Sequence, residues 1–148
     1  MSPDSLEAAL RAAGAVCAAV DALIDGADTR AFCAVRPPGH HATRDTAMGF
    51  CLFNNIAAGA AQALARGIER VAIVDFDVHH GNGTQDIFWN EPRVLYASTH
   101  QSPLYPGTGA RTETGAGNIV NVPLPPGAGS VEFRSAFSTA IAPALRDF

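Results

Sequence analysis

The chain has 148 residues, of which 47% are hydrophobic and 16% charged, a composition typical of a globular protein with a sizeable core and not of a disordered one. Its formal net charge of −4 gives no electrostatic basis for binding nucleic acid or an anionic membrane, no apolar run is long enough to span a bilayer, and the N-terminus lacks the basic flank of a signal peptide. Because Cys17, Cys33 and Cys51 are widely spaced without a C-x-x-C pair, we expect buried, reduced cysteines in a cytoplasmic protein.

Helices and strands are predicted to alternate along the chain. Apolar periodicity and turn residues predict, in chain order, a helix over 4–25, a strand over 31–35, a helix over 50–66, a strand that begins at 71, a short helix over 84–89, strands over 93–99 and 118–122, and a helix over 131–145. Pro123 is expected to stop the last strand. This order predicts an α/β fold with three layers, αβα, around a mostly parallel sheet, and one domain over residues 1–148.

Two carboxylates and an imidazole follow the apolar run that begins at Val71. In an extended strand Asp75, Asp77 and His79 share one face, at the end of the strand where α/β proteins usually bind ligands. The three side chains outline a metal site. The alternative is that they have no function, cap the strand and point into solvent. Catalytic zinc takes three protein ligands. Asp77 and His79 can supply two, no third candidate stands out, and Asp75 is better suited to orient a neighbouring histidine.

Two adjacent histidines, His40 and His41, lie in a loop that Pro37 and Pro38 stiffen. Either histidine alone would more often be a surface or core residue. A rigidly held pair suits proton transfer, because imidazole titrates near neutral pH. One ring would act as base and the other as acid while a metal-bound water attacks an amide carbonyl. The sequence has no G-x-S-x-G elbow, no C-x-x-C motif and no Walker A loop, which argues against serine hydrolase, dithiol and nucleotide chemistry.

Four motifs resemble those of the zinc-dependent histone deacetylase family, which includes bacterial acetylpolyamine amidohydrolases. They are RPPGHHA at 36–42, GFCLFNN at 49–55, DFDVHHGNGTQ at 75–85 and YPGTG at 105–109. The resemblance is strongest over residues 30–148, and the asparagine at position 82 together with RPPGHHA is similar to the class II branch. It implies the arginase/deacetylase fold and hydrolysis of the acetyl amide of acetyl-lysine or an acetylpolyamine, without direct binding of nucleic acid or membrane.

The resemblance also implies roles for individual residues. Asp77 and His79 match two zinc ligands, and His40 and His41 match the catalytic pair. Asp75 matches the partner of His40.

Further implied roles concern the partner of His41, the substrate tunnel and monovalent ions. Asn82 matches the partner of His41, Phe50 and Tyr105 match the aromatic walls of the tunnel for the acyl-lysine stem, and Gly49 lies beside that tunnel. A potassium ion is expected among Asp75, Asp77, His79, Ser98 and the main chain at Thr99. A second monovalent ion is expected, mostly on main-chain oxygens, at Phe88, Glu91, Val94 and Asn118.

The sequence also departs from the family pattern. The third zinc ligand, an Asp in a strand like SAGFDAH, and the Tyr of a GGGY-like loop are absent, as is the family's first strand. We therefore expect residues 1–148 to form part of a deacetylase domain that is inactive and aggregation-prone by itself. Two alternatives stay open: a non-catalytic module that binds a metal or acyl-lysine, and an arginase-like hydrolase with two manganese ions.

Overall fold

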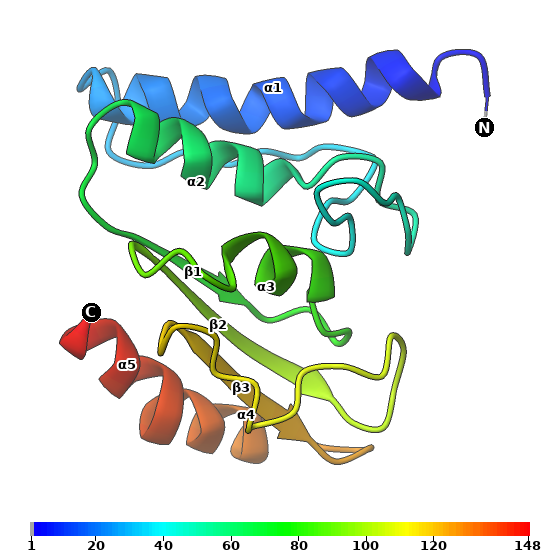
Figure 1. Cartoon of the computed structure of the whole chain (residues 1–148), viewed down its shortest axis with the longest axis vertical. Helices are drawn as coiled ribbons and strands as arrows, with labels where there is room; N and C mark the ends of the chain where they lie inside the picture. Colours follow the sequence, from blue (N-terminus) through cyan, green and yellow to red (C-terminus); the bar gives the residue numbers. More distant parts are fainter. Residues whose placement is uncertain (1) are drawn as a thin grey trace.

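The computed structural model describes residues 2–148, in which three helices precede or separate the strands and a longer helical segment follows them (Figure 1). The elements are α1 (Ser5–Ile24), α2 (Asn55–Ala65), β1 (Val71–Asp75), α3 (Asn82–Phe88), β2 (Val94–Gln101), β3 (Ile119–Leu124), α4 (Ser130–Ala136), the π-helical turn η1 (Phe137–Ile141) and α5 (Ala142–Asp147). The helix predicted over 131–145 therefore exists, but it contains one π-helical turn.

The three strands form one parallel sheet in the order β1-β2-β3. β1 pairs with β2 so that Asp75 lies opposite Ser98, and β2 pairs with β3 so that Tyr96 lies opposite Ile119. Since all strands run the same way, their carboxyl ends share one edge of the sheet. The loops that follow β1 and β2 start at this edge, which is where ligands bind in open α/β sheets (Figure 1).

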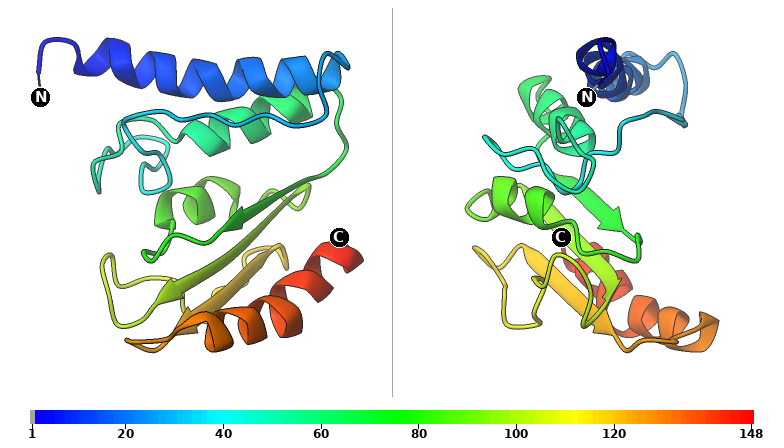
Figure 2. Two further views of the ribbon diagram at one scale, coloured as in Figure 1. Left: turned by 180° about the vertical axis from the view of Figure 1, so that it is seen from behind. Right: turned by 90° about the vertical axis from the view of Figure 1, so that its right-hand side faces the viewer.

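Helices cover both faces of the sheet, as Figures 1 and 2 show. One buried cluster joins α2 and α3 to the first face and contains Ala57, Ala60, Ile73, Phe88, Val94, Tyr96 and Ile119. A second cluster joins α4 and η1 to the opposite face and contains Ala97, Val122, Ala136 and Ile141. Neighbouring residues of β2 enter different clusters because side chains alternate along a strand. The predicted αβα layering around a parallel sheet is confirmed.

Helix α1 packs against the outer side of α2 and forms no part of the sheet layers (Figure 2). The two helices approach closely at Gly59, where a Cβ atom would lie 2.5 Å from Cγ1 of Val16. Nearer the C-terminus of α2, Gln62 Nε2 donates a hydrogen bond of 2.8 Å to Asp21 Oδ1. The small residues of α2 thus allow the close packing, and polar side chains fix its register.

The strand predicted over residues 31–35 is wrong. This segment is extended but forms no ladder with the sheet, the side chain of Phe32 is 92% exposed, and the Cys33 thiol contacts the carbonyl oxygen of Ala15 on α1. A cavity of about 650 Å³, lined by residues such as Ile56 and Ile73, lies beside β1, whose outer edge has no partner strand within residues 2–148. An apolar run indicates extended backbone, but it does not say whether a neighbouring strand is present.

The helix predicted over 50–66 begins only at Asn55, because Gly49 and Phe50 have φ angles of +55° and +64°, which an α-helix does not allow. Asn54 caps α2 instead, since its side chain accepts a hydrogen bond from the backbone of Ala57.

Other boundaries differ less from the prediction. Helix α3 begins two residues earlier than predicted, at Asn82. Strand β2 continues to Gln101, and β3 runs through Pro123 to Leu124. The predicted stop at this proline is wrong, because within residues 2–148 β3 is an edge strand, where proline is tolerated.

Cys51 is buried, whereas Cys17 and Cys33 are only partly buried, and all three thiols are free. The prediction of buried cysteines therefore holds fully for one of them. Among the helices of residues 2–148, none combines the length and apolar character needed to cross a membrane.

Candidate active site

Loops converge at the carboxyl edge of the sheet and carry the two adjacent histidines to the ends of the strands. The loop over residues 36–42 is fastened to the start of α3, where the amides of Gly83 and Thr84 donate to the carbonyl oxygen of His40 at 3.0 and 3.1 Å. The loop after β1 is fastened to β2, since the Gln101 amide donates to the Val78 carbonyl at 2.8 Å. These backbone hydrogen bonds bring together segments more than 20 residues apart in the chain.

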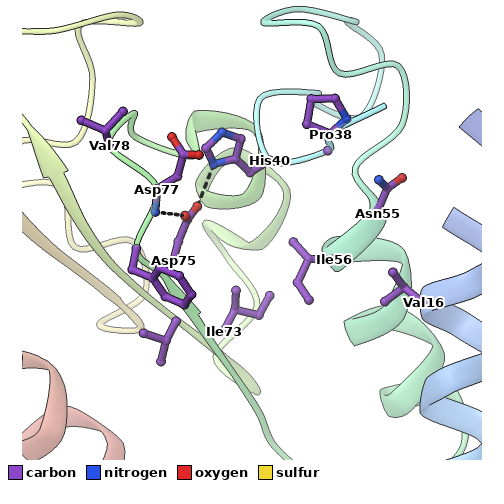
Figure 3. A pocket seen from close by; sticks show the side chains of 12 residues that line it. Val16, Pro38, His40, Asn55, Ile56, Ile73, Asp75, Asp77 and Val78 are labelled. Carbon is purple, nitrogen blue, oxygen red and sulfur yellow. Dashed lines mark hydrogen bonds and ion pairs between the residues drawn. The ribbon is translucent and has the colours of Figure 1, made fainter. Parts of the chain in front are cut away.

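His40 belongs to a cluster centred on the carboxylate of Asp75, at the end of β1 (Figure 3). Asp75 Oδ2 lies 2.9 Å from His40 Nδ1 and accepts a second hydrogen bond, of 3.0 Å, from the Tyr96 hydroxyl. That hydroxyl accepts from the backbone amide of Gly81 at 3.1 Å. A Cβ atom at Gly81 would lie 2.5 Å from the Tyr96 oxygen, so a side chain there would disturb the cluster.

His41 has a different partner. Its Nδ1 lies 2.9 Å from the amide oxygen of Asn82, the first residue of α3, and the residue is only 4% exposed. Because an amide oxygen only accepts hydrogen bonds, Nδ1 carries the proton and Nε2 of His41 is left as an acceptor. The ring lies against Gly49, where an added Cβ atom would overlap it. Glycine is therefore required at position 49 by a close approach as well as by its positive φ.

The two adjacent imidazoles have opposite electrostatic environments. Burial opposes protonation of His40, but the hydrogen bond and charge of Asp75 outweigh burial and raise the pKa of His40. The pKa of Asp75 is lowered: its burial is outweighed chiefly by the hydrogen bond and charge of His40. Burial lowers the pKa of His41, and the hydrogen bond with Asn82 only partly offsets this. His40 is thus biased toward the protonated form and His41 toward the neutral form.

Asp77 and His79 come together in a turn, not on the face of a strand. β1 ends at Asp75, so the predicted strand geometry is wrong for these two residues. The backbone turns because the amide of Asp77 donates to Asp75 Oδ1 at 3.2 Å, and the amide of His79 donates to Asp77 Oδ1 at 2.8 Å. His79 Nδ1 then lies 3.2 Å from Asp77 Oδ1.

The donor types of Asp77 and His79 fit zinc, which binds imidazole nitrogen and carboxylate oxygen. Their side chains are 50% and 40% exposed, so a ligand can reach them. Residues 2–148 contain no group of three or more His, Cys, Asp or Glu side chains arranged to hold a metal ion. Asp77 and His79 are thus a pair of suitable donors without a third such side chain beside them in the described residues.

Tyr105 lies beside both histidines that face this site. Its ring centroid is 5.1 Å from that of His41 and 6.2 Å from that of His79, and both contacts are edge-on. Phe50 is 93% exposed and lines a separate cavity of about 560 Å³ with Met48 and other residues. The structure thus brings Tyr105 against the histidines, while Phe50 lies at the surface.

The residues expected around potassium are also brought together in part. Ser98 lies opposite Asp75 in the parallel register, and Ser98 and Thr99 are buried. The Ser98 hydroxyl is 3.0 Å from His100 Nδ1. Carboxylate, hydroxyl and carbonyl oxygens are the donors that hard cations prefer, so the donor set fits such an ion.

A buried polar network behind the site is not predicted from the sequence. His80 Nε2 is 3.1 Å from Gln85 Oε1, and Gln85 Nε2 donates to Glu113 at 2.6 Å. Glu113 accepts from the amide of Gly109, whose carbonyl oxygen is 3.0 Å from His100 Nε2. Burial lowers the pKa of His80 to about 4, so this histidine is neutral near pH 7. Its Nδ1 lies 2.7 Å from the hydroxyl of Thr108 and so holds the loop that carries Tyr105.

Tyr96 is the other residue that sequence reasoning missed. The only indication in the sequence is a general one, that the hydroxyl of a buried tyrosine usually has a hydrogen-bond partner. The partners of Tyr96 and of the polar network lie up to 28 residues away in the chain, and only the fold brings them together.

The fold and the site define an αβα protein with an adjacent histidine pair beside Asp77 and His79 at the carboxyl edge of a parallel sheet. The sequence matches the histone deacetylase domain family over residues 1–148, and the chain belongs to this family. It is 45% identical over 154 aligned residues to a histone deacetylase-like amidohydrolase of Pseudomonas aeruginosa, and the match covers 100% of this chain and 40% of that protein.

Solved structures agree with the family assignment. The HD domain of HDA15 superposes with a TM-score of 0.92 at 45% identity, over 95% of this chain and 43% of that one. The acetylpolyamine aminohydrolase of Burkholderia pseudomallei gives a TM-score of 0.86 at 40% identity, over 92% and 41%. The chain therefore spans less than half the length of these relatives.

Proposed function

We propose that the protein hydrolyses the acetyl amide of acetyl-lysine side chains or of acetylpolyamines. The observation that carries this proposal is the position of His41, whose ring lies 5.9 Å from that of His79 and 5.1 Å from that of Tyr105, between centroids. A proton acceptor thus lies beside both an aromatic side chain and one of the two residues that we propose as metal ligands. The names of the relatives, an amidohydrolase and an acetylpolyamine aminohydrolase, agree with this chemistry.

Zinc is the cofactor that we propose. Asp77 and His79 would hold it, together with a third ligand that residues 2–148 do not supply. Bound zinc polarises a carbonyl group and lowers the pKa of water to about 7. We also propose potassium as a structural ion beside Asp75, with Ser98 and the main chain of Thr99 as further donors.

The two histidines have different roles in this proposal. His41 takes a proton from the attacking water, because its Nε2 is an open acceptor and its ring lies edge-on to that of His79. His40 gives a proton to the departing amine, because its partner is the Asp75 carboxylate, which stabilises the imidazolium form. Asn82 and Asp75 hold the two rings in these orientations.

The substrate would reach the histidines past Tyr105. Its ring is nearly perpendicular to that of His41, and we propose that an alkyl chain ending in the acetyl amide lies along the Tyr105 ring. The positive charge of a lysine or polyamine amine is removed by acetylation, which suits an approach past aromatic and glycine residues. Gly49 packs against the His41 ring without a side chain, and we assign Phe50 to the outer rim because it is exposed.

The proposal is tested with the full-length protein, an acetyl-lysine peptide and an N-acetylated diamine. We expect acetate release from at least one substrate, inhibition by a hydroxamate, and a loss of roughly a hundredfold or more in kcat for His41→Ala. The matched control is Arg44→Ala, which changes an exposed side chain near the same loop. Full, hydroxamate-insensitive activity of His41→Ala would overturn the proposal.

A further inference from the structure

Three main-chain carbonyl groups converge at the C-terminal end of α3, the end opposite Asn82. They belong to Phe88, Glu91 and Val94, the last residue of α3, the connecting loop and the first residue of β2. The side-chain nitrogen Nδ2 of Asn118 lies among their oxygens, at 2.9, 3.1 and 2.8 Å. Asn118 is buried and immediately precedes β3. We call the three oxygens the carbonyl cluster.

The orientation of the Asn118 amide is fixed by its other end. Its Oδ1 accepts a hydrogen bond of 3.0 Å from the backbone amide of Ala116, which can only donate. The NH₂ group must therefore face the carbonyl cluster. The main-chain oxygen of Asn118 is used as well, since it accepts from the amide of Tyr96 at 2.9 Å.

The carbonyl cluster has the chemistry of a monovalent cation site. Rings of main-chain carbonyls replace the hydration shell of such ions, and the resemblance to deacetylases implies an ion at these positions. The position of the Asn118 side chain leaves no room for an ion there. A cation held by the oxygens of Phe88, Glu91 and Val94 would have to lie where Asn118 Nδ2 lies.

We propose that the side-chain amide of Asn118 replaces a monovalent cation in this protein. Its partly positive NH₂ group shares two hydrogens among three acceptors and neutralises their mutual repulsion without an ion. The amide ties the end of α3 to the starts of β2 and β3. Since α3 begins at Asn82, this tie also supports the residue that orients His41. The inference does not depend on the proposed activity.

The test compares the melting temperature of the full-length protein in potassium chloride and in tetramethylammonium chloride, whose cation is too large for the cluster. The difference in melting temperature of the wild-type protein between the two salts measures the effect of any potassium bound beside Asp75. We expect the same difference in every variant, so it serves as the baseline. Asn118→Ala removes the amide from the three oxygens of the carbonyl cluster, of which those of Phe88 and Glu91 keep a backbone donor. We expect its melting temperature to fall by about 5 °C in tetramethylammonium and potassium to restore at least half of that loss beyond the wild-type response.

The matched control is Asn54→Ala. Asn54 is also buried, but its Nδ2 donates to one carbonyl and one hydroxyl, those of Ala42 and Thr84. Its loss should lower the melting temperature with no added potassium response. An equal potassium response in wild type and Asn118→Ala would overturn the proposal.

A second measurement does not depend on a folded variant. Crystals of the wild-type protein grown in rubidium chloride should show no anomalous peak among the oxygens of Phe88, Glu91 and Val94. A rubidium peak at that place would show that a cation occupies the cluster beside or instead of Asn118, and the proposal would be wrong.

Discussion

At the residue scale, the neighbours of each histidine determine what its ring can do. Gly49 offers the sharpest test, because its φ of +55° and its contact with His41 both exclude a side chain. We predict that Gly49→Ala lowers stability by about 2–4 kcal/mol, from backbone strain together with the overlap with His41. It should lower kcat by about a hundredfold, since small misplacements of catalytic groups are costly. Urea unfolding and steady-state kinetics of the full-length protein measure the two effects.

The matched control for Gly49→Ala is Gly26→Ala. Gly26 also has a positive φ, of +74°, but a Cβ atom there would meet no neighbour within 4 Å. It should cost only the backbone strain, about 1 kcal/mol of stability, and leave kcat unchanged. An equal loss of activity in both variants would show that backbone strain, and not the contact with His41, explains the effect.

Tyr96 supports Asp75 from within the core. Tyr96→Phe would leave the amide of Gly81 and Oδ2 of Asp75 with one hydrogen-bond partner fewer. We predict a loss of about 1–3 kcal/mol in the free energy of unfolding, measured with urea at constant m value. Tyr105→Phe is the control, because Tyr105 is 46% exposed and should stay within about 0.5 kcal/mol of wild type. Unchanged stability of Tyr96→Phe would mean that its hydroxyl does not support Asp75.

Sequence reasoning identified the residues that lie together in short motifs. His40 and His41 are adjacent, and Asp75, Asp77 and His79 follow one another at steps of two, so their chemistry is visible in the chain. The contacts of the Tyr96 hydroxyl and of the Asn118 side chain were beyond the same reasoning for a physical reason. Tyr96 reaches Asp75 only through the parallel register of β1 and β2, and the carbonyl groups that accept from the Asn118 side chain lie more than twenty residues away in the chain.

At the element scale, the packing of α1 on α2 depends on Gly59. Gly59→Ala would bring a methyl group within 2.5 Å of Val16 Cγ1, and overpacking of this kind costs about 1–3 kcal/mol. Gly14→Ala is the control on α1, where a Cβ atom meets nothing within 4 Å, and it should gain up to about 1 kcal/mol from helix propensity. Thermal or urea unfolding distinguishes the two. Equal gains would show that α1 is not closely packed on α2.

The elements with strong periodicity were predictable, and those that depend on distant partners were not. α1 has bounds within one residue of the prediction, because a long apolar stripe and end signals agree. Residues 31–35 have strand-like composition but no ladder, and Gly49 and Phe50 turn where a helix is predicted. In each failure a tertiary or backbone constraint, invisible in hydrophobic periodicity, decides the structure.

At the scale of the whole molecule, the site lies at the carboxyl edge of a parallel sheet and is open on the outer side of β1. Within residues 2–148 β1 has no neighbour on its outer side, and a cavity of about 650 Å³ lies there, lined by His40, Asp75 and Asp77 (Figure 3). The alternation of strands and helices was enough to predict the layers. It was not enough to predict which face of Asp77 and His79 a ligand can reach, because this depends on the turn after β1.

The central claim is that Asp77 and His79 hold a zinc ion needed for amide hydrolysis beside His41. The most direct measurement is acetate release by the full-length protein before chelation, after chelation, and after zinc is returned. We predict that activity is lost with the metal and restored by about one zinc ion per chain, and that Asp77→Ala fails to recover. Activity that persists in metal-free protein, or full recovery of Asp77→Ala at one zinc per chain, would contradict the claim.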